Sequence, residues 1–227
     1  MNKRSKRYRA LQGLYDASKS YSVSEVVALL KKTGNTKFDA GVELHLRLGI
    51  DPKKADQLVR GSVVLPHGTG KMKKIAVFCE TADQKKAKDA GAELVGGDEL
   101  ISEIKKTGKC SFDIALATPE MMKKMGQIAK ILGPKGLMPN PRNETVVKDI
   151  SLGVKALAGG KIAFRNDDSG NIHQLVGRIS FTEKQLEENL ATFIEAIRSN
   201  RPATAKGTYL KTVSACTTMG PGIKVTA

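Results

Sequence analysis

The feature that most constrains the fold is a strict alternation of apolar and polar residues over positions 42–50. The apolar positions are Val42, Leu44, Leu46, Leu48 and Ile50, and the positions between them are Glu43, His45, Arg47 and Gly49. Successive side chains of a strand point to opposite faces of a sheet, so this period of two predicts a strand with one buried and one wet face. Such strands are typical of antiparallel sheets covered on one side. A Ser22-Val23-Ser24-Glu25 capping box predicts a preceding helix that runs to about Lys32.

The middle of the chain has a different pattern. Residues 75–79 are continuously apolar, which is typical of a strand buried on both faces. Helices are predicted over 82–90 and 98–107, strands over 93–95 and 112–116, and a further helix from Thr118-Pro119-Glu120. This alternating order predicts a small, doubly wound parallel sheet with helices on both faces.

After Gly160 the antiparallel pattern returns. Segments 161–165 and 172–180 flank a turn-rich stretch and predict a hairpin, Thr182 caps a helix over 183–198, and strands follow over 208–217 and 222–226. The predicted fold class is therefore mixed α/β and α+β with two domains. A discontinuous α+β domain is built from residues 1–67 and 160–227, and a Rossmann-like parallel α/β domain, residues 68–159, is inserted in it.

Hinges are expected near 66–70 and 158–160, where the chain crosses between the two predicted domains. Glycine absorbs backbone rotation at low steric cost. The residues that carry this expectation are Gly68, Gly70, Gly159 and Gly160.

The charge balance narrows the class of partner. The 227 residues include 38 Lys and Arg against 23 Asp and Glu, a net charge of +15. A field of this sign favours polyanions, with nucleic acid first and an anionic membrane surface second. The basic N-terminal run, which includes Arg4, Arg7 and Arg9, is either a solvated arm or a contact for phosphate. No apolar run approaches the about 20 residues of a spanning helix, and no secretory signal is visible, so we expect a cytoplasmic protein without a membrane partner.

Motifs for metal, cofactor and catalysis are missing from the sequence. Cys79, Cys110 and Cys216 form no C-x-x-C pair and are interpreted as small core residues in a reducing cytosol. The three histidines are too far apart in sequence for a local metal motif. His45 is expected to be solvated or salt-bridged, with a hydrogen bond to RNA as the alternative. Gly68-Thr69-Gly70-Lys71 lacks the first glycine of a phosphate loop, and Met72 replaces its Ser or Thr. We therefore predict no catalytic residue, metal or cofactor.

Three loops combine features suited to RNA. Lys37-Phe38-Asp39 places a cation and a ring before the alternating strand, and Thr217-Thr218-Met219-Gly220 supplies hydroxyls, a flexible apolar chain and a glycine. From the residues alone, a plain turn is the favoured interpretation and an RNA contact is the alternative. The Pro- and Gly-rich loop 133–142 is either a rigid connector or a second basic surface that presents Lys135 and Arg142.

Two of these loops, in combination, carry a specific resemblance. They are Ile131-Leu132-Gly133-Pro134-Lys135-Gly136-Leu137-Met138-Pro139-Asn140-Pro141 and Thr217-Thr218-Met219-Gly220-Pro221. Further matching stretches cover residues 6–11, 37–39, 48–52, 60–61, 65–68, 96–97, 164–167 and 206–208. In these stretches the chain resembles the bacterial ribosomal protein L-one family, found on the mobile side stalk of the large subunit.

The resemblance implies a hinged two-domain protein, monomeric when free, that binds stalk rRNA chiefly through its discontinuous domain. The matching RNA-facing residues are Lys37, Phe38, Glu43, Asp167, Thr212, Thr218, Met219 and Gly220. It also implies contacts with other ribosomal components, assistance in releasing deacylated tRNA from the exit site, and repression of the protein's own operon through an mRNA that mimics the rRNA site. Two alternatives stay open: an enzyme that binds a nucleotide in the inserted domain, and a non-specific basic adaptor for polyanions.

Overall fold

The computed structural model describes residues 5–71, 73–81 and 83–226. The chain forms two compact units: Met1–Gly70 with Ala163–Ala227, here the discontinuous unit, and Lys71–Ile162, here the inserted unit. The sequence analysis places the corresponding boundaries at 67/68 and 159/160. Among the helices of these described segments, none has the length and apolarity needed to cross a membrane.

A four-stranded antiparallel sheet is the centre of the discontinuous unit. Its strands lie in the order β7-β1-β8-β9. Their bounds are Gly41–Leu48 for β1, Asn171–Arg178 for β7, Leu210–Thr217 for β8 and Ile223–Val225 for β9. β1 is the predicted alternating strand, and its apolar residues from Val42 to Leu48 are no more than 3% exposed.

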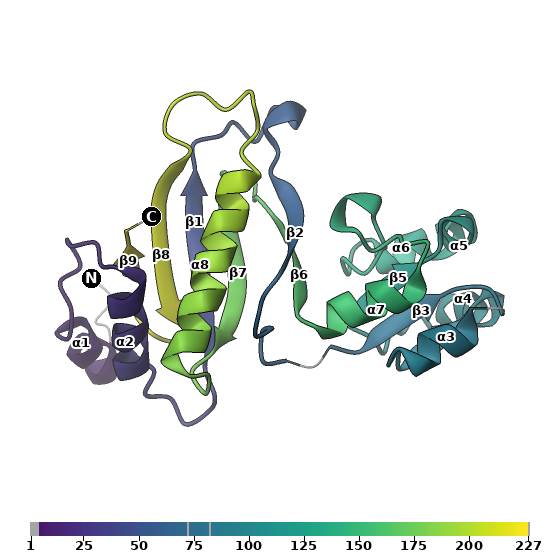
Figure 1. The fold of residues 1–227 in the computed structure, drawn as a ribbon, viewed down its shortest axis with the longest axis horizontal. Helices are drawn as coiled ribbons and strands as arrows, with labels where there is room; N and C mark the ends of the chain where they lie inside the picture. Colours follow the sequence, from purple (N-terminus) through teal and green to yellow (C-terminus); the bar gives the residue numbers. More distant parts are fainter. Residues whose placement is uncertain (1–4, 72, 82, 227) are drawn as a thin grey trace. The chain divides into compact units, whose positions relative to one another are not determined.

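Two amphipathic helices cover one face of this sheet (Figure 1). They are α2, Val23–Thr33, and α8, Glu183–Ser199, and each begins with a complete capping box. Leu30 of α2 and Phe193 of α8 are fully buried beneath them. The short helix α1, Lys6–Gln12, precedes α2, and the 3-10 turn η1, Ala55–Gln57, follows β1. The polar face of the sheet has no comparable layer of helices in the described part of the unit.

The predicted hairpin between 161–165 and 172–180 is wrong. β6, Lys161–Arg165, pairs with β2, Arg60–Val64, in a separate two-stranded sheet, whereas β7 pairs with β1. Asn166 explains the difference, because its main-chain amide donates to the Val59 carbonyl at 3.0 Å and its side-chain oxygen accepts from the Val59 amide at 2.8 Å. These bonds hold the end of β6 beside the strand that follows Val59.

The inserted unit contains the predicted parallel sheet, in the order β4-β3-β5. The strands are β3, Ile75–Phe78, β4, Leu94–Gly96, and β5, Ile114–Ala117. Its helices are α3 Gln84–Asp89, α4 Asp98–Thr107, α5 Pro119–Met125, α6 Ala129–Leu132 and α7 Ile150–Ala158, with 3-10 turns η2 Gly126–Ile128 and η3 Pro141–Asn143. All four residues of β3 are buried, with Phe78 in the core on one side and Val77 in the core on the other. The predicted fold class is confirmed.

Some local predictions need correction. The helix predicted from Thr118 is interrupted at Gly126 by a 3-10 turn, which separates α5 from α6. β2 and α7 are not predicted from sequence. Cys79 is a core residue as expected, but Cys110 and Cys216 are only half-buried, Cys216 because it lies on the polar face of the sheet.

Three of the four glycines predicted as hinges need glycine's conformational freedom. Gly68, Gly70 and Gly160 have φ values of 63°, 73° and 98°, in the left-handed region where a Cβ is strained. Gly159 instead ends α7 with a φ of −72°, which any residue can adopt. The hinges themselves remain a prediction.

Candidate nucleic-acid interface

The polar face of the four-stranded sheet, here the open face, is the platform of the candidate interface. Residues directly opposite each other in antiparallel strands place their side chains on the same face. The register groups Glu43 with Leu175 and Cys216, His45 with His173 and Ser214, and Arg47 with Asn171 and Thr212. From Gly41 to Arg47, β1 extends this face over about 20 Å.

Met219 marks one end of the open face. It follows β8 in a turn closed by a 2.7 Å hydrogen bond from the Gly220 amide to the Thr217 carbonyl. Its φ is 66°, a conformation uncommon outside glycine, and its side chain is 67% exposed. A strained backbone that presents a large apolar side chain to solvent makes Met219 a candidate functional residue.

Gly220 leaves no room for a side chain in this turn. A Cβ at that position would lie 2.1 Å from the Thr217 hydroxyl oxygen and 3.1 Å from the Thr217 carbonyl oxygen. Thr218 ties the same turn to β1, since its amide donates to the Gly41 carbonyl at 2.9 Å and its hydroxyl oxygen accepts from the Gly41 amide at 3.1 Å. The turn is therefore fixed to the central strand of the platform.

Phe38 lies on the segment that joins α2 to β1, and its ring is 54% exposed. The hydroxyl of Thr36 donates to the Phe38 carbonyl at 2.8 Å. Immediately after Phe38, the Asp39 carboxylate accepts from the amide and hydroxyl of Ser180 at 3.1 and 2.9 Å. Bonds on both sides thus hold the segment that exposes Phe38, and Lys37 beside it is also exposed.

Arg7 links the segment of Phe38 to the turn of Met219. Its guanidinium donates to the Asn35 side-chain oxygen at 3.0 Å and to the Met219 carbonyl at 2.8 Å. Arg7 belongs to the basic run that the sequence predicts to be either a solvated arm or a phosphate contact, but the structure shows that it is half-buried and already bonded within the protein. Asn35 is a member of this arrangement that sequence reasoning misses, because nothing in the local pattern distinguishes it from a solvated loop residue.

Asp167 and Thr212 lie toward the opposite end of the open face. The Asp167 carboxylate accepts from the amide of Ser169 at 2.9 Å and from the amide and side chain of Asn171 at 2.7 and 3.0 Å. The bond from the Asn171 amide is the main reason that the pKa of Asp167 lies below its usual value. Thr212 is exposed on β8 in the row of Arg47 and Asn171.

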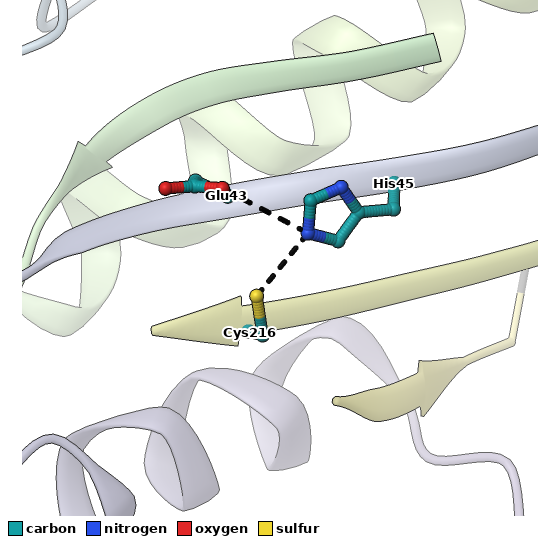
Figure 2. A group of neighbouring side chains, drawn as sticks. All are labelled: Glu43, His45 and Cys216. Atoms are coloured by element: carbon teal, nitrogen blue, oxygen red, sulfur yellow. Dashed lines mark hydrogen bonds and ion pairs between the residues drawn. The ribbon is translucent and has the colours of Figure 1, made fainter. Parts of the chain in front are cut away.

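A cluster of titratable side chains lies between the two ends (Figure 2). The His45 Nε2 atom is 3.2 Å from the Cys216 sulfur and 3.9 Å from a Glu43 carboxylate oxygen, and its Nδ1 atom is 2.8 Å from Nδ1 of His173. Burial and the neighbouring His173 lower the pKa of His45, while Glu43 acts in the opposite direction. Burial, with a smaller contribution from Glu43, raises the pKa of the Cys216 thiol. The sheet register, which is not visible in sequence, assembles this group.

Three of the remaining predicted basic contacts lie on other elements than the open face. Arg9 is exposed on α1. Lys135 belongs to the inserted unit, where its ammonium donates to the Gly108 carbonyl at 3.2 Å. Arg142 lies in η3 of the inserted unit, and Arg4 is outside the described residues.

Comparison with known proteins identifies the family. The model of the ribosomal protein L1p/L10e family matches residues 30–221. The chain belongs to this family. A Mesoplasma florum protein named large ribosomal subunit protein uL1 is 50% identical over 225 residues, 99% of each chain. A Chloroflexus aggregans protein of the same name is 48% identical over 227 residues, 99% of this chain and 96% of the other.

Family membership confirms the resemblance seen in the sequence. Proteins of this family are structural ribosomal proteins and not enzymes, so the prediction of a non-enzyme is confirmed as well. The alternative of a nucleotide-binding enzyme loses its support.

Proposed function

We propose that the chain is a structural protein of the large ribosomal subunit, in the cytoplasm, that binds a folded rRNA segment of the mobile side stalk through its discontinuous unit. The observation that carries this proposal is the pair of exposed apolar side chains, Phe38 at 54% and Met219 at 67%. Exposed apolar groups of this size on firmly held loops suit the faces of unstacked bases and riboses.

The other residues of the surface have complementary roles in this proposal. Lys37 neutralises phosphate, while Glu43, Asp167, Thr212 and Thr218 exchange hydrogen bonds with 2′-hydroxyls and base edges. Gly220 lets the RNA backbone approach the turn closely. Arg4, Arg9 and, from the inserted unit, Lys135 and Arg142 add salt-sensitive attraction for phosphate.

Arg7 acts in this scheme as a positioning residue. Its bonds to Asn35 and Met219 support the two segments that carry the apolar contacts. Its removal would therefore weaken RNA binding by loosening both segments, rather than by the loss of one phosphate contact.

Two finer activities rest on the family resemblance alone. In the first, the ribosome-bound protein contacts exit-site tRNA, together with other ribosomal components, and assists release of the deacylated tRNA. In the second, the free monomer represses its own operon by binding an mRNA that mimics the rRNA site. One surface would then bind both rRNA and mRNA. A substitution in this surface should therefore weaken rRNA binding and mRNA binding by the same factor.

The test is a comparison of binding to the stalk rRNA fragment and to a scrambled duplex across a salt series. Met219→Ala and Phe38→Ala should each weaken binding to the fragment by about 1–3 kcal/mol, the range of a stacked base contact. Met219→Ala keeps a non-glycine residue at the same φ, so it removes the side chain without relieving the backbone.

Leu152→Ala is the matched control, because Leu152 is also 67% exposed but lies in the inserted unit. It should leave binding to the fragment unchanged. Equal and steeply salt-dependent binding to both RNAs would instead support the non-specific basic adaptor.

A further inference from the structure

The Glu43–His45–Cys216 cluster on the open face combines three kinds of metal-ligating atom. A carboxylate oxygen, an imidazole nitrogen and a thiol sulfur all lie within 4.8 Å of one another. Glu43 and His45 come from β1 and Cys216 from β8, so the sheet itself fixes their spacing. The side chains of His45 and Glu43 are 29% and 41% exposed, which leaves the cluster accessible from solvent.

The distances in the cluster are close to those of a tetrahedral site. Zinc binds sulfur at about 2.3 Å and nitrogen or oxygen at about 2.0–2.1 Å, which places ligand atoms about 3.3–3.6 Å apart. The His45 Nε2 atom lies 3.2 Å from the Cys216 sulfur and 3.9 Å from the Glu43 oxygen. The exposed Glu43 side chain can close the remaining distance by a change of rotamer.

The second nitrogen of His45 is positioned as in known zinc-binding histidines. Its Nδ1 atom is 2.8 Å from Nδ1 of His173, so one of these two atoms must carry the proton when both rings are neutral. His173 Nε2 lies 3.7 Å from the Asp167 carboxylate, which favours a proton on that nitrogen. His173 Nδ1 is then the acceptor, His45 Nδ1 the donor, and His45 Nε2 has a lone pair directed at the cluster. A ligating histidine typically donates its other N–H to a carboxylate, a backbone carbonyl or water, and here an imidazole nitrogen takes the place of that acceptor.

The donor set also selects the class of metal. A thiolate and an imidazole favour zinc and similar soft or borderline cations over magnesium and calcium, which prefer oxygen ligands. When Cys216 binds a metal it loses its thiol proton to the buffer. Thiolate, carboxylate and neutral imidazole then carry two negative charges, which balance the divalent ion.

We propose that Glu43, His45 and Cys216 form a binding site for Zn²⁺, with His173 as the partner that orients His45. Three protein ligands leave one position for a donor from solvent, as in open zinc sites. The proposal is independent of RNA binding, although Glu43 belongs to both surfaces.

The test is a titration of the full-length reduced chain with Co²⁺, without RNA. A thiolate-to-cobalt charge-transfer band should rise to one equivalent and disappear when Zn²⁺ displaces the cobalt. Cys216→Ser should abolish the band. Glu43→Gln, a change at a partly exposed side chain, should weaken metal binding by more than about 10-fold, and His173→Gln by about 10- to 100-fold, as for a typical partner of a ligand.

Cys110→Ser is the matched control, because Cys110 is also a half-buried free cysteine but lies in the inserted unit. It should keep the band and the affinity. The proposal is overturned if the folded native chain gives no charge-transfer band, or if the band persists in Cys216→Ser. Neither result would affect the proposed contacts of Phe38 and Met219 with RNA.

Discussion

At the scale of single residues, Met219 presents its side chain at a cost in backbone free energy. A left-handed conformation is unfavourable by about 1–2 kcal/mol for a non-glycine residue. Three main-chain groups of its turn are bonded, to Arg7, Thr217 and Gly41, so the surrounding structure maintains this conformation. Glycine at position 219 would remove the strain together with the apolar contact. The sequence therefore retains a strained methionine where a relaxed turn was available, which fits a role in binding.

His45 leads to a prediction about how the free energy of unfolding depends on pH. Burial and His173 place its pKa below the ordinary 6.5, so just below that pH the unfolded chain binds more protons than the folded chain. The free energy of unfolding should therefore rise with pH between the folded-state pKa of His45 and about pH 6.5, and this contribution is complete above that range. Its charged and titratable neighbours are Glu43, His173 and Cys216, with Asp167 beyond His173.

Urea unfolding of the metal-free chain at about pH 7.5 and about pH 5.5 measures this effect. The native chain should lose more stability on acidification than His45→Gln does. Equal losses in the native chain and His45→Gln would show that His45 does not contribute.

At the scale of elements, α8 is fixed by a buried polar residue. Asn189 is fully buried, accepts from the His67 amide at 3.2 Å, and donates to the carbonyls of Gly68 and Val176 at 2.9 and 2.8 Å. It therefore connects α8 to β7 and to the segment where the chain leaves the discontinuous unit. A buried main-chain group that loses its hydrogen-bond partner destabilises the folded state, because its loss of hydration is no longer compensated.

Asn189→Ala should lower the free energy of unfolding by about 1–3 kcal/mol, because three main-chain groups lose their bond to its side chain, one of them buried and two partly buried. Denaturant unfolding measures the change. Asn200→Ala is the control: Asn200 is exposed at the end of α8 and donates to one carbonyl, so its loss should change stability by about 0.5 kcal/mol or less. A similar small change in both variants would contradict the role given to Asn189.

The elements also show how far sequence reasoning reaches. Periodicity and capping identify β1, α2 and α8, because amphipathic patterns are local and strong. The same reasoning pairs β6 with β7 across a turn, and fails because Asn166 bonds to the distant Val59. Pairing between distant strands also brings His45 and Cys216 together. The alternating pattern predicts from sequence that Glu43, His45 and Arg47 lie on the polar face of β1. No local signal in the sequence identifies their partners on β7 and β8.

At the scale of the whole molecule, two segments of the chain connect the units, and each contains a strand. β2 leads out of the discontinuous unit and β6 leads back, and together they form a sheet of only two strands. Such a sheet is marginally stable by itself, and relative motion is the default expectation for two domains of one chain. With positive φ values at Gly68, Gly70 and Gly160, this supports the hinge predicted from sequence.

Small-angle scattering of the native chain should therefore require more than one separation between the units. Gly68→Ala and Gly160→Ala should alter the distribution of separations, because alanine at a positive φ is unfavourable by about 1–2 kcal/mol and the connecting segments must readjust. One fixed separation, the same with and without RNA, would contradict the hinge.

Two glycines within the inserted unit provide controls matched in backbone conformation. Gly108 has a φ of 64°, against 63° for Gly68, and Gly91 has the same φ of 98° as Gly160. A Cβ added at Gly108 or Gly91 would meet no neighbouring atom within 4 Å, so alanine there adds backbone strain alone. Gly108→Ala and Gly91→Ala should lower stability by a similar amount and leave the distribution of separations unchanged. If all four variants change the scattering alike, loss of stability rather than the hinge explains the effect.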